Sequence, residues 1–229
     1  MSFEAYGRFW DFRGDIKSAV YKVGDDAEFQ AKNQLAFLKS VGLKKSTKVL
    51  DLGCGCLRGA LDLIQYLNKG CYTGVDVSKG LLDAGTQRAG NLMGEKNVCL
   101  ALADSFDYGK AVDGKKYDIV FSNSVVTHLL PEDIEAYFKG VAGLLSKKGK
   151  FYFTMYPLPD HVPGNSRGNI GLISFKKEFL IEKAKKAGLD VTDIEGEFAN
   201  PKPSNKVIDK VNTPYLGQWV MKGELCKKQ

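Results

Sequence analysis

The sequence predicts an α/β fold in which parallel strands form one sheet with helices packed against it. Short apolar runs alternate with helix-like stretches, an order that joins parallel strands by right-handed crossovers. One such run ends in the glycine turn Gly53-Cys54-Gly55, directly before a helix-like stretch. The chain of 229 residues, 44% hydrophobic and 26% charged, is long enough to bury the core of such a fold.

The first part of the chain supplies three strands and the helices around them. The elements expected in order are helix 26–41, strand 48–52, helix 60–67, strand 71–77, helix 78–93 and strand 97–103. The first helix is indicated by an apolar stripe at helical spacing, formed by Phe29, Leu35, Phe37, Leu38 and Val41. The strands are β-branched and apolar, and Ser78 is the expected N-cap of the third helix.

The second part continues the alternation. The expected elements are strand 117–122, helix 131–146, strand 151–156, helix 174–188 and the strands 189–195 and 218–222. Pro131 with acids behind it is typical of a helix start, and Ser174 is the expected cap of the last helix. The segment 157–173 holds three prolines and three glycines and is expected to be a loop, either a substrate-side lid or a surface excursion. Its end, 170–173, is an alternative edge strand.

Composition excludes several classes of protein. No apolar run approaches the ~18 residues of a membrane span, and no apolar leader opens the chain, so we expect a cytoplasmic protein without membrane contact. The net charge of +6, from 33 basic and 27 acidic residues, is spread over the chain, and lysine pairs recur along it, which favours a solvated surface over a nucleic-acid footprint. Five cysteines without a C-x-x-C pair, with only two histidines, predict no metal site.

Parallel sheets bind ligands beyond the carboxyl ends of their strands, so the residues after each strand are candidates. The Gly-x-Gly turn brings bare backbone N–H groups close to a ligand. Asp76 ends the next strand, where an acid can accept hydrogen bonds from both ribose hydroxyls. These features also fit a dinucleotide, but the G-x-G-x-x-G pattern laid from Gly53 fails at Arg58. Asp51 would repel a pyrophosphate and suits an ammonium group, which favours a nucleoside joined to a cationic amino acid.

At this point the residues resemble a known family, the class I S-adenosylmethionine (SAM) dependent methyltransferases. VLDLGCGCLRGA resembles their first motif, YTGVDVS their second, LALADS their third and YDIVFSNSVVTHL their fourth with the segment after it. The likeness in order and spacing covers about residues 46–156. GCGCLRGALDLIQYL is also similar to a bacterial subgroup that carries GCG-x-LRG, mostly of undefined substrate.

The resemblance implies a Rossmann-like three-layer sandwich whose seven-stranded sheet is mostly parallel, with an antiparallel C-terminal strand. It implies a single methyltransferase domain over residues 26–229. Residues 1–25 are then an N-terminal extension rich in aromatic and basic residues. In this family such extensions often fold over the pocket, so we expect a lid, with a helix packed on the sheet as the alternative and a nucleic-acid arm less favoured.

The resemblance also implies SAM as cofactor and places its contacts. Asp51, Gly53 and Gly55 would surround the methionine moiety, and Asp76 would hold the ribose. At the adenine, Val77 would pack on the ring, Asp104 would accept from the amino group, and Ser105 and Phe106 would lie beside the ring. At the methionine end, Asn123 or Ser122 would lie close to the cofactor. Arg58 would bind the methionine carboxylate or point to solvent. The third glycine common in the family falls at Leu57, a departure from the pattern.

Methyl transfer needs alignment of cofactor and acceptor, and a general base only for an acceptor that is protonated at rest. His128, after the fourth strand, is the best candidate for a base or an acceptor ligand, with a structural histidine as the alternative. Tyr156, at the end of the fifth strand, is a second candidate. Asp160 and His161 in the proline-rich segment are weaker candidates for substrate contacts.

The acceptor is expected to be a small molecule rather than a nucleic acid. The fourth strand ends in Ser122-Asn123-Ser124-Val125, not in the Pro-Pro-aromatic tetrapeptide of methylases that act on exocyclic base nitrogens. Three alternatives stay open: an RNA or protein methyltransferase, an NAD(P)-dependent oxidoreductase and a non-catalytic SAM-binding protein. Arg58, and the absence of a Tyr-x-x-x-Lys pair after the fourth strand, count against the oxidoreductase.

Overall fold

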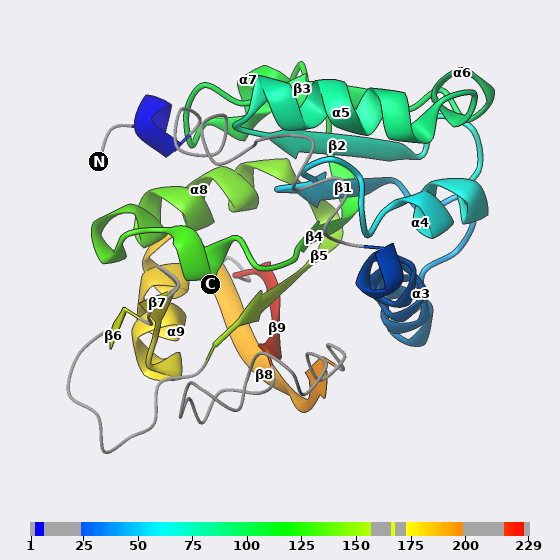
Figure 1. Cartoon of the computed structure of the whole chain (residues 1–229). Helices are drawn as coiled ribbons and strands as arrows, with labels where there is room; N and C mark the ends of the chain where they lie inside the picture. Colours follow the sequence, from blue (N-terminus) through cyan, green and yellow to red (C-terminus); the bar gives the residue numbers. More distant parts are fainter. Residues whose placement is uncertain (1–2, 7–23, 157–165, 168–172, 199–217, 227–229) are drawn as a thin grey trace, which may run out of the picture.

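The computed structural model describes residues 3–6, 24–156, 166–167, 173–198 and 218–226. Its centre is a seven-stranded sheet with the strand order β3-β2-β1-β4-β5-β9-β8 (Figure 1). The strands are β1 Val49–Leu52, β2 Tyr72–Asp76, β3 Cys99–Leu102, β4 Tyr117–Ser122, β5 Leu145–Met155, β8 Leu189–Phe198 and β9 Gln218–Leu225. β9 runs antiparallel to β5 and β8, while β1 to β5 pair in parallel. The predicted mostly parallel sheet with an antiparallel C-terminal strand is confirmed.

Helices cover both faces of the sheet, which gives the expected three layers (Figure 1). They are α3 Gly24–Ser40, α4 Leu61–Tyr66, α5 Lys79–Ala89, α6 Leu92–Glu95, α7 Tyr108–Ala111, α8 Ile134–Leu144 and α9 Lys177–Lys186. Leu38 of α3, Ile64 of α4 and Leu82 of α5 belong to one buried apolar cluster, and residues of α7, α8 and α9 belong to a second. Strand residues alternate between the clusters, as Ile119 and Val120 of β4 do, because successive side chains point to opposite faces.

Local signals at the element ends were partly right. Ser78 caps α5 as predicted, its hydroxyl accepting a hydrogen bond from the Leu81 N–H at 3.1 Å. The predicted helix 78–93 is divided into α5 and α6 at Gly90, whose φ of +51° ends the first helix. The prediction for Ser174 was wrong. Ser174 belongs to β7 Ile173–Ser174, which pairs with β6 Ser166–Arg167, and α9 begins only at Lys177.

The expected strand at 151–156 begins earlier, at Leu145, because β5 pairs with β4 through a register shift near its start. The preceding helix therefore ends at Leu144. Most of the predicted loop 157–173 and residues 7–23 of the predicted extension lie outside the described residues, as do Asp160 and His161. Within the described ranges, no helix is both long and apolar enough to cross a bilayer.

The strand order creates one switch point. From β1 the chain proceeds outward to β2 and β3, and then returns to place β4 on the other side of β1. The connections after β1 and β4 therefore leave the sheet in opposite directions. In open α/β sheets such a point, at the carboxyl ends of the strands, forms a crevice for ligands.

Candidate functional site

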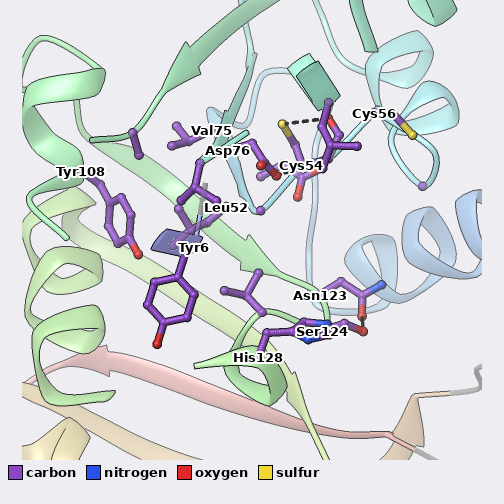
Figure 2. Close-up of a pocket in the computed structure, with 18 of the residues that line it drawn as sticks. Tyr6, Leu52, Cys54, Cys56, Val75, Asp76, Tyr108, Asn123, Ser124 and His128 are labelled. Atoms are coloured by element: carbon purple, nitrogen blue, oxygen red, sulfur yellow. Dashed lines mark hydrogen bonds between the residues drawn. The ribbon is translucent and has the colours of Figure 1, made fainter. Parts of the chain in front are cut away.

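A cavity of about 330 Å³ lies at this switch point. Its walls come from the segments after β1, β2, β3 and β4, together with α3, η1 (Val126–His128) and residues 3–6 (Figure 2). In Figure 2 the rings of Tyr6 and Tyr108 lie at one end, Asn123, Ser124 and His128 lie below, and Asp76 and Cys54 lie above. A cavity of this size and mixed polarity is typical of a small-ligand site.

The glycine turn after β1 needs glycine for two reasons. Gly53 has φ +80° and Gly55 has φ +53°, the left-handed region that side chains disfavour. A Cβ on Gly53 would lie 2.2 Å from Cγ2 of Val125, so the turn packs directly against the segment after β4. The two connections that diverge at the switch point are thus held together, and both line the cavity.

Leu57 adopts the backbone conformation that glycine would favour. Its φ is +57°, and its side chain is fully buried in the apolar cluster shared with α4 and α5. A Cβ on Gly85 of α5 would lie 3.0 Å from Cγ of Leu57, so Gly85 leaves the space that the leucine fills. The departure from the family pattern therefore keeps the path of the turn and directs the side chain away from the cavity.

Asp76 ends β2 and ties the glycine turn to it. One carboxylate oxygen accepts the Gly55 N–H at 2.8 Å, and the other accepts the Ser78 N–H at 2.9 Å. The residue is only 7% exposed, and it lines the cavity. A carboxylate offers about four acceptor positions, so the same group can hold the turn and accept hydrogen bonds from ligand hydroxyls.

Asp51, on β1, is the second acid of the cavity. The Tyr72 hydroxyl donates a hydrogen bond of 2.8 Å to it, and the Gln34 side chain hydrogen-bonds it as well. Burial, and secondarily the charge of Asp76, raise the pKa of Asp51 to about 7, although both hydrogen bonds act to lower it. A carboxylate kept so far from water favours a cationic ligand group, which would restore its charged form.

The segment after β4 is fixed by β5. Thr154 donates its hydroxyl hydrogen to the Asn123 side-chain oxygen at 2.9 Å and accepts the Ser124 N–H at 2.7 Å. Ser124 takes φ +60° and begins the turn that leads to η1. His128 ends η1, is half-buried and lines the cavity. Asn123 and His128 therefore face the same space from a rigid support.

Aromatic residues close the opposite end. The Phe3 ring meets the Phe106 ring edge-on at 4.7 Å, and Tyr6 and Tyr108 pack around this pair. The Tyr6 hydroxyl donates to Asp133 at 2.7 Å and accepts the Leu130 N–H at 2.9 Å. Burial and the bond to Asp133 raise the pKa of Tyr6, so it stays a neutral donor. Residues 3–6 thus form part of the cavity wall.

The structure brings most of the predicted site residues together. Those that line the cavity are Asp51, Gly53, Gly55, Arg58, Asp76, Val77, Phe106, Asn123 and His128. Arg58 is also exposed to solvent, as its alternative interpretation expected. Asp104 is exposed and bonded to the Ser105 hydroxyl at 3.0 Å, and neither residue lines the cavity. Tyr156 is half-buried at the end of β5 and does not line it either.

Sequence reasoning assigned no site role to several lining residues, among them Phe3, Tyr6 and Gln34. Phe3 and Tyr6 belong to the extension that was expected as a lid, but nothing singled them out. Gln34 lay within a helix predicted only from its apolar stripe, and it is 4% exposed. A search of the described residues finds no group of three His, Cys, Asp or Glu side chains placed to hold a metal ion.

Comparison with known proteins agrees with this geometry. Residues 49–149 match the family described as "Methyltransferase domain". A protein of Schizosaccharomyces pombe, described as an uncharacterized methyltransferase, is 28% identical over 131 residues, which are 55% of this chain and 46% of that protein. The chain thus spans about half the length of this curated relative.

Solved structures match the whole fold. Magnesium protoporphyrin IX methyltransferase from Synechocystis, solved with bound S-adenosylhomocysteine (SAH), gives a TM-score of 0.69 at 16% identity, covering 97% of this chain and 99% of that one. The glycopeptide N-methyltransferase MtfA gives 0.63 at 16% identity, covering 86% and 95%. Identities this low establish a shared fold, which is that of Rossmann-like methyltransferases.

Proposed function

We propose that this chain, whose residues 49–149 match a methyltransferase domain, is a SAM-dependent methyltransferase that acts on a small-molecule acceptor. One observation carries the proposal. Asp51 and Asp76 flank the glycine turn, and both face a single cavity at the switch point of the sheet. This arrangement suits a ligand with a cationic group near one acid and neighbouring hydroxyls near the other.

The residues present fit SAM. Asp51 would hold the ammonium group, the turn at Gly53 and Gly55 would border the methionine moiety, and Asp76 would accept from the ribose hydroxyls. Val77 and Phe106, with the aromatic wall behind them, would pack against the adenine. The fit is poorer for a pyrophosphate, because two buried carboxylates line the cavity that it would have to enter.

When bound, SAM supplies the electrophilic methyl group. The chain's own residues then align and shield the reactants. Asn123, held by Thr154, gives the cavity a fixed amide at the end of β4. His128 lines the cavity and could there take a proton from an acceptor hydroxyl or amine, and we assign the base to it rather than to Tyr156, which does not line the cavity. Phe3 and Tyr6 exclude water on the opposite side.

A small-molecule acceptor is supported by the absence of a Pro-Pro-aromatic tetrapeptide after β4 and by the names of the neighbouring structures. Two of these are named for a porphyrin and a glycopeptide as substrates.

The chain is proposed to consist of an N-terminal extension, residues 1–25, and a methyltransferase domain, residues 26–229. The extension is proposed to complete the pocket, since Phe3 and Tyr6 within it line the cavity.

The proposal is tested by following a labelled methyl group. The protein is incubated with methyl-labelled SAM and, in parallel, with a small-metabolite fraction, total RNA and a protein extract. We expect label to appear in the small-metabolite fraction and to be lost with Asp76→Ala. Label in RNA or protein would overturn the small-molecule acceptor, and binding of SAM without transfer to any fraction would indicate a non-catalytic binding protein.

A further inference from the structure

We propose that Gln34 of α3 is a positioning residue that holds the Asp51 carboxylate toward the cofactor's ammonium group, and that Gly59 is glycine in order to admit it. The inference rests on the proposed function, because it assigns a role within the same cofactor site. It also gives a physical reason for the last glycine of the GCG-x-LRG pattern, Gly59, which lines the same cavity.

Gln34 is buried in a place where a polar side chain needs partners. It is 4% exposed, it lines the cavity, and its side chain hydrogen-bonds Asp51. Buried amides are retained where their hydrogen bonds are made, since an unpaired one is costly. A neutral amide donates to a carboxylate without cancelling its charge, so Asp51 keeps its charge for a ligand cation.

Gly59 lies on the other side of the same amide. A Cβ at this position would lie 2.7 Å from Oε1 of Gln34, closer than real Cβ contacts. Gly59 needs no left-handed backbone conformation, since its φ lies outside that region. A side chain at this position would therefore require the Gln34 amide to move from its place beside Asp51, whereas the path of the backbone does not itself require glycine.

Asp51 is held from two elements. Tyr72 of β2 donates to one carboxylate oxygen at 2.8 Å, and Gln34 reaches the carboxylate from α3. The titratable groups facing Asp51 are Tyr72 and Asp76 from β2 and Cys54 from the glycine turn, and Arg58 and His128 line the same cavity. Loss of Gln34 removes one of the two donors that favour the charged form of Asp51.

The test measures SAH affinity by calorimetry between pH 6 and 9 in the full chain. We expect Gln34→Ala to weaken SAH binding about tenfold, as loss of a hydrogen bond to a charged group does, and to move the pH midpoint of binding upward. Gly59→Ala should weaken binding because its methyl group displaces the amide. The double variant should bind no more weakly than Gln34→Ala alone, since the two changes act through one contact.

Gly94→Ala on α6 is the matched control, because a Cβ there meets nothing within 4 Å. Urea unfolding of every variant confirms that the compared proteins are folded. Additive effects of Gly59→Ala and Gln34→Ala, or an unchanged pH midpoint in Gln34→Ala, would overturn the role of Gln34. Failure of the unmodified protein to bind SAH would instead overturn the proposed function, so the two failures are distinguishable.

Discussion

Asp51 is a buried acid that faces the cavity and whose pKa is raised. It lies close to a second buried carboxylate, and two neutral side chains, Tyr72 and Gln34, hydrogen-bond it. Burial of such a group lowers the stability of the ligand-free protein, and a bound cation would offset this loss. The raised pKa of Asp51 would also make binding of that cation sensitive to pH near neutrality.

We therefore predict that the affinity for SAH rises with pH. The pKa of Asp51 is about 7 in the ligand-free protein, so below pH 7 the acid holds a proton that the ligand's ammonium group must displace. Well below that value the dissociation constant should fall about tenfold for each pH unit, and it should level off above pH 8. Calorimetry across pH 5–9 measures the profile.

Asp51→Asn should bind SAH weakly and with a flat profile over the same range, while Asp83→Asn, in an exposed ion pair with Lys79, should keep the wild-type profile. A wild-type affinity that does not change with pH would show that Asp51 does not hold the ammonium group.

Leu57 gives a prediction about stability alone. Because its side chain is fully buried while its backbone is left-handed, Leu57→Gly should keep the turn and empty a core position. We expect the free energy of unfolding to fall by about 2–4 kcal/mol in urea titrations. SAH affinity of the folded variant should change little. A large loss of affinity at unchanged stability would mean that the leucine shapes the cofactor site directly.

The sequence predicted the place of some site residues and not of others. Asp51 and Asp76 were found because each lies at the carboxyl end of a predicted strand, and the edge where parallel strands end is fixed by the fold. Gln34 could not be found, because only the packing of α3 on the turn before α4 brings it to Asp51, 17 positions away in the chain. Asp104 fitted the motif but lies exposed and does not line the cavity, although Phe106, two residues on, does.

At the scale of elements, the N-terminal turn is the piece that completes the site. Residues 3–6 are joined to the start of α8 by the Tyr6 hydroxyl and to the segment after β3 by the Phe3 and Phe106 rings. Tyr6 is also part of the buried cluster shared with α8 and α9, and Phe3 packs against that cluster. The rest of the two clusters comes from the sheet and its helices, so we expect the α/β fold to form without the turn.

We predict that deletion of residues 2–23 abolishes methyl transfer and weakens SAH binding, while the circular dichroism spectrum still shows the α/β fold. The aromatic wall loses Phe3 and Tyr6 in this variant, and water gains access to the cavity. Tyr6→Phe is a less disruptive variant. It keeps the ring, removes the two hydrogen bonds of the hydroxyl group and should speed SAH dissociation. Unchanged turnover in the truncated protein would show that the extension is no lid.

Other elements show where local signals mislead. Ser78 follows β2 directly and its hydroxyl caps α5, whereas Ser174 pairs with Ser166 as part of β7. The early start of β5 at Leu145 was invisible in the sequence, because its lysines and glycine resemble a helix end. Strand pairing, which depends on distant segments, overrode the local pattern in both cases.

At the scale of the molecule, the position of the site depends on the topology of the sheet. The order of strands places the ends of β1 and β4 beside each other, and this was predictable from the alternation of elements and the family resemblance. The cavity that results is lined by acids, a glycine turn and an aromatic wall, which are the features a sulfonium nucleoside requires. The central claim to test is therefore that the cofactor bound in this cavity is SAM.

Thermal unfolding with SAH and, separately, with NADH tests this claim most directly. At a hundredfold its dissociation constant, a ligand adds roughly 2.7 kcal/mol of stability, which for a domain of this size raises the Tm by about 5–10 °C. We predict that shift with SAH, its loss in Asp76→Ala, and no shift with NADH. A shift with NADH and none with SAH would contradict the methyltransferase assignment and indicate a nicotinamide-dependent enzyme.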